Sequence, residues 1–157
     1  MIEVLKQAAN HKGTAFIEIF QNCLVFNDNA FINYTDNDLK EEHAIYLQDG
    51  KPLLYGKNND KAIKLAGFHP DVISTGSCNP NEIFVHHESA KDRGLAYVLG
   101  QMGIENPELP VAFGIFRKVT EPTYQERILD HERQAKEKNP NMTLEQVLNT
   151  GDTWTVV

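Results

Sequence analysis

The pattern of apolar positions predicts a helix followed by a buried strand at the start of the chain. Apolar residues recur at helical spacing in residues 2–12, and Gly13 follows them as a helix stop. Residues 14–20 are almost continuously apolar, which is typical of a strand buried on both faces of a parallel sheet. These are the parts of an α/β domain, and we expect the chain to begin inside one.

The middle of the chain is less regular. Residues 27–38 are crowded with Asn and Asp without a clear period, which predicts a long surface loop that is solvated or docks on a partner. Residues 43–56 are predicted to form a β-hairpin, because an Asp-Gly pair separates two apolar runs. We expect a short helix at residues 61–66 and a small strand at residues 83–85.

The second half of the chain alternates between core-facing and solvated elements. A core-facing helix is predicted before Gly103, because four apolar residues recur at helical spacing (Leu95, Val98, Leu99 and Met102). Residues 111–119 predict a second buried strand, and residues 124–138 a highly charged helix. Thr143 and Gln146 have the spacing of a capping box, which predicts a last short helix.

Composition and charge exclude several classes of function. The 157 residues suffice for one domain, and their net charge of −7 argues against a nucleic-acid partner, which needs clustered Lys and Arg. No stretch approaches the roughly 20 apolar residues of a membrane span, and the opening residues lack the pattern of a signal peptide. Two cysteines are too few for a disulfide framework, so we expect a reducing, cytoplasmic setting.

Cys23 is the first candidate for specific chemistry. It follows the predicted buried strand, at the kind of sheet edge where α/β proteins place their ligands. A thiolate there can bind a soft metal or an iron–sulfur cluster, but a single cysteine cannot hold a cluster. The residues alone favour an inert thiol that packs as a small hydrophobe. Cys78 is interpreted as a free thiol in a loop.

Other polar residues point less clearly to a site. His86 and His87 are adjacent, lack the spacing of a zinc motif, and are interpreted as a surface turn. Glu18 falls inside the predicted buried strand, so we expect it to pair with a partner or to lie at a sheet edge. Arg117 and Lys118 lie at the end of the second predicted strand and could meet an acidic protein or phosphates.

Several stretches, in order along nearly the whole chain, resemble one enzyme subunit. They are residues 4–28 with the motif QNC–FND, DGKPLLYGKNNDKAIKL, FHPDVIS, VHHE, PVAFGIFRKVTEPTYQE and the terminal LNTGDTWTV. Together they look like the C-terminal portion of the β subunit of the 2-oxoacid:ferredoxin oxidoreductases, of the 2-oxoglutarate type. The resemblance implies an α/β fold: part of a thiamine-diphosphate-binding parallel-sheet domain, with an added β-hairpin and C-terminal helices.

The resemblance also implies an activity and its cofactors. Such enzymes decarboxylate a 2-oxoacid with thiamine diphosphate and Mg²⁺, pass electrons through a four-iron four-sulfur cluster to ferredoxin, and form acyl-coenzyme A. The cysteine of the QNC motif supplies a cluster ligand in this family, which assigns that role to Cys23. The other cluster ligands and the Gly-Asp-Gly motif that binds thiamine diphosphate have no counterpart in this sequence. We therefore expect no catalytic residue here and no activity from the chain alone.

These expectations divide the chain and name its partners. Residues 1–28 are expected to form the last helix–strand unit of the cofactor-binding domain, and residues 29–157 its C-terminal extension. The partners implied are the α subunit, ferredoxin, coenzyme A and the 2-oxoacid, with no membrane and no nucleic acid. An alternative is an interaction module that keeps the fold without redox chemistry. A small metal-binding protein built on Cys23, Cys78 and His86 has the weakest support.

Overall fold

The computed structural model describes residues 1–154 and 156, which form two compact units. Residues 1–11 and 15–120 make up the first unit, and residues 12–14 and those from 121 onward the second. The terminal GDTWTVV stretch reaches Thr155 and Val157, which lie outside the described residues. No helix in the described part of the chain is both long and apolar enough to cross a bilayer.

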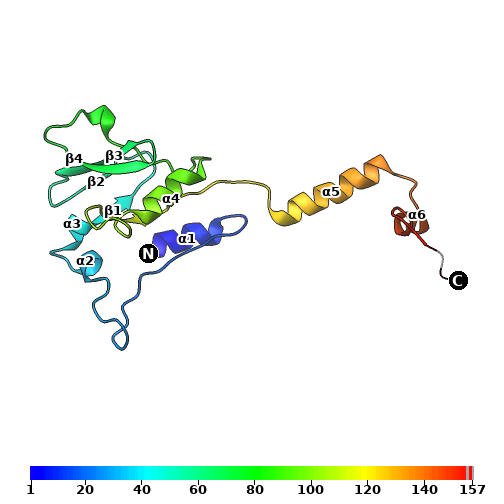
Figure 1. Cartoon of the computed structure of the whole chain (residues 1–157), viewed down its shortest axis with the longest axis horizontal. Coiled ribbons are helices and arrows are strands. Elements are labelled where there is room, and N and C mark those ends of the chain that lie inside the picture. Colours follow the sequence, from blue (N-terminus) through cyan, green and yellow to red (C-terminus); the bar gives the residue numbers. More distant parts are fainter. Residues whose placement is uncertain (155, 157) are drawn as a thin grey trace. The chain divides into compact units, whose positions relative to one another are not determined.

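Most of the regular structure lies in the first unit (Figure 1). Its helices are α1 (Ile2–Asn10), α2 (Ile32–Thr35), α3 (Lys40–His43), a 3₁₀ turn (Pro80–Glu82) and α4 (Arg93–Gln101). Its strands are β1 (Ala44–Leu47), β2 (Leu54–Tyr55), β3 (Lys61–Ala66), β4 (His69–Ser74) and β5 (Val111–Gly114). The second unit contains α5 (Tyr124–Lys138) and α6 (Leu144–Leu148).

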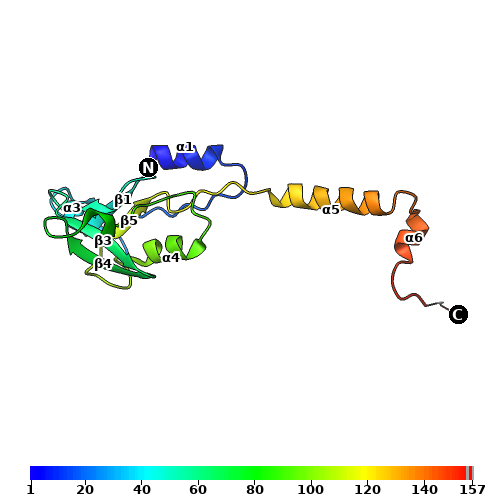
Figure 2. The same ribbon diagram turned by 90° about the horizontal axis from the view of Figure 1, so that it is seen from above.

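The strands form two small sheets of different kinds. β1 and β5 pair in parallel, with Ile45 opposite Ala112 and Tyr46 opposite Phe113. β2, β3 and β4 form an antiparallel sheet in that order, in which β3 and β4 make a hairpin (Figure 2). The predicted α/β class is confirmed by this mixture of helices with parallel and antiparallel strands.

The core of the first unit lies between the two sheets and α4. Its buried members come from β1, β5, α4 and the segment that enters the antiparallel sheet (Ile45, Leu47, Leu53, Tyr55, Ile63, Leu99, Met102 and Ala112). Period-two alternation in β1 turns Ile45 and Leu47 inward and leaves Tyr46 60% exposed. The edge of this core is covered by partly buried residues such as Phe84 and Phe116.

The prediction of a buried strand at residues 14–20 is wrong for this structure. No strand forms there, and Phe16 is 91% exposed. A strand of a parallel sheet needs a hydrogen-bonded neighbour and cover on both faces, and no described strand pairs with this segment. Glu18 is exposed as well, so its carboxylate needs no buried partner. The domain boundary after residue 28 stays a prediction.

Two further elements were predicted with the wrong partner or type. β1 pairs with β5, not with β2, so residues 43–56 do not form the predicted hairpin. Residues 61–66 form β3 where a helix was predicted, because their backbone pairs with β4 across a two-residue turn at Gly67-Phe68. Of the small strand predicted at residues 83–85, only an isolated bridge between Val85 and Pro52 forms.

The helices with strong local signals are confirmed. α5 has the predicted bounds, and Thr123 caps its N-terminus in a reciprocal capping box with Glu126. Thr143 and Gln146 make the predicted box at α6. α1 ends close to Gly13, and α4 ends just before Gly103, whose φ of +72° is in the left-handed region.

Gly103 and Gly100 give a matched test of the turn that leads from α4 towards β5. A Cβ on Gly103 would lie 2.5 Å from Val111 Cγ2 and 2.8 Å from Val111 N, whereas Gly100 has open space around it. Gly103→Ala is expected to destabilise the protein by about 1–2 kcal/mol from its left-handed backbone alone, with the crowding added. Gly100→Ala, inside α4, is expected to stabilise it by about 0.5–1 kcal/mol. Urea denaturation measures both, and equal effects would contradict the geometry of this turn.

The cap of α5 makes a pH-dependent prediction. Glu126 pairs with Lys12 and accepts a hydrogen bond of 2.8 Å from the Thr123 backbone N–H, and these contacts lower its pKa from 4.5 to about 2. Because the folded-state pKa is depressed, the stabilisation is complete above about pH 4.5 and is lost as the pH falls towards about 2.

Amide chemical shifts in an NMR titration test this cap. The Thr123 amide is expected to titrate with a midpoint near 2. The Thr143 amide is the matched control, because it donates to the uncharged side chain of Gln146 at 2.8 Å and should not titrate with it. A Thr123 midpoint near 4.5, the ordinary value for Glu, would contradict the contacts of Glu126 with Lys12 and Thr123.

Candidate functional site

Cys23 lies in a short surface loop whose backbone is closed on itself. The Asn27 N–H donates to the Cys23 carbonyl at 3.0 Å, and the two residues form an isolated antiparallel bridge. The Cys23 side chain is exposed, so the interpretation as an inert buried thiol is wrong. Without a buried strand before it, the cysteine is carried by the loop itself.

The backbone of this loop favours the thiolate form of Cys23. Hydrogen bonds from the backbone N–H groups of Phe26, Val25 and Asn27 lower the pKa of the Cys23 thiol, and the slight desolvation of the thiol opposes them. Several amide donors around one sulfur stabilise its negative charge. A thiolate is also the form that binds soft metals and iron–sulfur clusters.

The tip of the Cys23 loop is apolar and open to solvent. Leu24, Val25 and Phe26 are 78%, 82% and 91% exposed. Together with Phe16 they place large apolar side chains within a few residues of the thiol on either side of it. An exposed apolar cluster of this kind is typical of a surface that another protein covers.

The base of the loop is closed by side chains that the sequence analysis missed. Asn22 Nδ2 donates to Asp28 Oδ1 at 2.9 Å, across the loop from Cys23. The ring of Phe20 stacks on Phe31 at 4.7 Å between centroids and meets Phe113 of β5 edge-on at 5.5 Å. The amino-acid sequence gives only a weak indication of these ring contacts, because Phe113 is far from the loop along the chain.

Among the described residues, side chains that could bind a metal do not gather around Cys23. The described residues contain no group of three or more His, Cys, Asp or Glu side chains that could hold a metal ion. Cys78 is partly buried in the loop after β4, where its thiol lies 4.0 Å from the Thr75 carbonyl oxygen. The described structure therefore gives no support to a metal site built jointly on Cys23, Cys78 and His86.

The two adjacent histidines have different environments, which corrects the prediction of a surface turn. His86 is only 2% exposed, and its Nε2 donates to the Ile115 carbonyl at 2.8 Å. His87 is exposed, and its Nδ1 lies 3.9 Å from Asp49 Oδ1. The buried ring of His86 thus ties the segment before α4 to the chain that follows β5.

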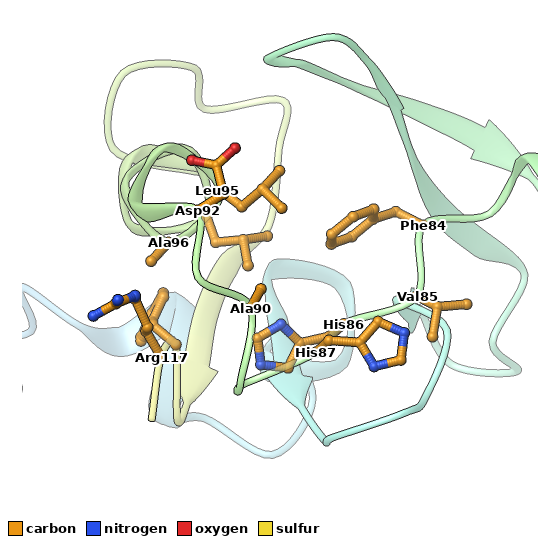
Figure 3. A pocket seen from close by; sticks show the side chains of 11 residues that line it. Phe84, Val85, His86, His87, Ala90, Asp92, Leu95, Ala96 and Arg117 are labelled. Atoms are coloured by element: carbon orange, nitrogen blue, oxygen red, sulfur yellow. The ribbon is translucent and has the colours of Figure 1, made fainter. Parts of the chain in front are cut away.

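His86 and His87 also border a small cavity of about 70 Å³ beside α4 (Figure 3). Most of its lining is apolar, with Phe84, Leu95 and Leu99 among the lining residues. No residue of the Cys23 loop lines it, so it is separate from the candidate site. Its small volume and apolar lining suit a packing defect of the core better than a substrate pocket.

Arg117 and Lys118 follow β5 and engage neighbouring parts of the same unit. Arg117 Nη2 donates to the Lys91 carbonyl at 3.5 Å. Lys118 Nζ donates to Gln7 Oε1 at 2.7 Å and lies 3.7 Å from Glu88. Their predicted role towards an acidic protein or phosphates stays a prediction.

Comparison with known proteins shows what the chain is related to. It is 34% identical, over 158 aligned residues and 99% of its length, to the 2-oxoglutarate oxidoreductase subunit KorB of Mycobacterium tuberculosis (strain ATCC 25618 / H37Rv). The chain is a homologue of part of that subunit. It spans 42% of the length of KorB.

The other comparisons give no match. No model of a protein family matches the chain. No solved structure matches it either. The resemblance to a β subunit of this kind is confirmed by the homology to KorB, which is consistent with a C-terminal portion.

The two histidines provide a matched test of the buried link. His86→Leu leaves the Ile115 carbonyl without its side-chain donor, and this is expected to lower the free energy of unfolding by about 1–3 kcal/mol. His87→Leu changes an exposed side chain and is expected to stay within about 0.5 kcal/mol of the wild type. Urea denaturation of both variants measures the difference, and equal losses would show that the His86–Ile115 bond contributes nothing specific.

Proposed function

We propose that the chain is part of the β subunit of a 2-oxoacid:ferredoxin oxidoreductase of the 2-oxoglutarate synthase type. In this role Cys23 supplies one thiolate ligand to a four-iron four-sulfur cluster. The observation that carries the proposal is the exposed Cys23 thiol of the QNC–FND segment, and the lowered pKa of this thiol, caused by backbone N–H groups, supports it. The homology to KorB supports the choice of enzyme.

When bound, the cluster would supply one-electron transfer between the 2-oxoacid that is being oxidised and ferredoxin. The part of this chain would be to hold one ligand. Hydrogen bonds from the N–H groups of Phe26, Val25 and Asn27 lower the pKa of the Cys23 thiol, and hydrogen bonds to a cluster sulfur also tune the reduction potential of the cluster. The apolar tip of the loop would exclude water once it is covered.

The remaining parts of the enzyme would come from outside this sequence. Neither the Gly-Asp-Gly motif for thiamine diphosphate and Mg²⁺ nor counterparts of the other cluster cysteines that the resemblance implies occur in it, so the chain alone would be inactive. We place it in a complex with the α subunit that acts on coenzyme A and a 2-oxoacid and reduces ferredoxin. Two unpaired cysteines are compatible with the reducing cytoplasm as its location.

A second candidate is an interaction module that keeps the fold without redox chemistry. It is favoured by the second unit, in which no described residue is buried although α5 and α6 expose Ile128, Leu144 and Leu148. Helices with apolar side chains and no core of their own are suited to binding another protein. The two candidates differ in whether Cys23 holds iron.

A tagged copy of the chain, purified without oxygen from the cells that encode it, tests the proposal. Its complexes are analysed for iron, acid-labile sulfide and the EPR signal of the reduced cluster. Cys23→Ala is expected to remove at least half of the cluster signal while the complex still assembles. Cys78→Ala is the matched control and should keep the wild-type signal. Complexes that contain no iron, or a full cluster in Cys23→Ala, would favour the interaction module.

A further inference from the structure

The two ends of the loop that carries Cys23 lie close together. Phe20 precedes the loop and Phe31 follows it, and their rings stack at 4.7 Å with an interplanar angle of 26°. Between them, the Asn22 amide donates to the Asp28 carboxylate, and the Asn27 N–H donates to the Cys23 carbonyl. The loop is therefore closed at three levels, from its base to the cysteine.

The base of the loop, at Phe20 and Phe31, is anchored to β5. Phe20 meets Phe113 of β5 edge-on, at 5.5 Å and 76°. Tyr34, in α2, lies 6.4 Å from Phe20 and 6.1 Å from Phe113, both between ring centroids. We call Phe20, Phe31, Tyr34 and Phe113 the aromatic clasp. It joins both ends of the loop to a strand that belongs to the sheet.

The clasp is the element that fixes the loop in place. Residues 21–30 are all exposed, so the loop gains no rigidity from burial of its own side chains. By contrast, Phe20, Phe31, Tyr34 and Phe113 are partly buried. Edge-to-face and stacked ring pairs stabilise an arrangement beyond their buried area, and they do so with a defined geometry.

We propose that Phe20 is a positioning residue for the Cys23 ligand, acting through the aromatic clasp. This inference rests on the proposed role of Cys23. In that role, the sulfur must meet a cluster whose other ligands lie outside this sequence, so its position has to be set by the residues around it. Ligands are held to the required precision by the residues behind them, and a loop without such support places its ligand too loosely.

The first test measures the loop in the chain itself. The exchange rate of the Asn27 amide hydrogen reports whether the bond to the Cys23 carbonyl is kept. Phe20→Ala is expected to speed this exchange about threefold to tenfold, the range that corresponds to the loss of aromatic pair contacts. Phe20→Tyr keeps the ring and is expected to exchange like the wild type. Phe68→Ala removes an exposed phenylalanine from the β3–β4 turn and is the matched control.

The second test measures the cluster in the purified complex. Phe20→Ala is expected to lower the iron content of the complex or to shift the EPR spectrum and reduction potential of the cluster, and Phe20→Tyr is expected to restore them. Asn22→Ala is a second variant that controls for misfolding of Phe20→Ala. It removes only the exposed hydrogen bond between Asn22 and Asp28 across the loop. It should shift the same EPR spectrum while the far-UV circular dichroism stays unchanged.

The outcomes separate this inference from the proposed function. If Cys23→Ala removes the cluster but Phe20→Ala and Asn22→Ala leave its iron content, EPR spectrum and potential unchanged, the positioning role is wrong and the ligand role stands. If Cys23→Ala leaves the cluster intact, the ligand role fails and the positioning role fails with it. Wild-type exchange of the Asn27 amide in Phe20→Ala would show that the clasp does not hold the loop.

Discussion

The pairing of β1 with β5 is the constraint on which the first unit depends. It places Ile45 opposite Ala112 and Tyr46 opposite Phe113. Because successive residues of a strand point to opposite faces, this register gives the two faces of the sheet different roles. Ile45, Leu47 and Ala112 enter the core on one face, while Tyr46 and Phe113 stand on the other. A shift by one residue would exchange these faces and remove both the core and the clasp.

This pairing also explains why the sequence predicted some elements and not others. The capping boxes of Thr123 and Thr143 and the glycine behind α4 are local signals, and the helices that they begin or end lie where the sequence placed them. Whether β1 turns back on β2 or pairs with β5 depends instead on contacts far apart in the chain. The predicted turn at Asp49-Gly50 does form, with a φ of +68° at Gly50, although β1 does not pair with β2. Turn chemistry therefore could not choose the partner.

Residues 61–66 show the same limit at the level of a single element. Lys-Ala-Ile-Lys-Leu-Ala contains residues that are acceptable in a helix, and Gly67 behind it has the appearance of a helix stop. In the structure the Ile63 N–H donates to the Leu53 carbonyl, and the Phe84 N–H donates to the Ile63 carbonyl. The segment is extended because two neighbours accept and supply its backbone hydrogen bonds. Tertiary contacts outweigh weak local preferences in such a case.

The environment of Cys23 differs from the one that the sequence predicted, and its role as a cluster ligand stays a prediction. The resemblance pointed to Cys23, whereas the hydrophobic pattern placed it behind a buried strand that does not form here. That segment is apolar enough for a strand buried on both faces, yet Phe16 and Ile19 are exposed. An apolar segment indicates that it is to be buried, but its own sequence does not say which neighbouring element will bury it.

The exposed apolar loop and the anchored base of the Cys23 site place opposite demands on one short segment. In the proposed function, its exposed apolar tip would be covered by the protein that carries the other cluster ligands. Its base would have to be fixed, because a thiolate that moves cannot meet those ligands with a defined geometry. The aromatic clasp meets both demands, because it ties the loop to β5 through Phe20 and leaves the Cys23 thiol exposed. β5 thus contributes Ala112 to the core on one face and Phe113 to the aromatic clasp on the other.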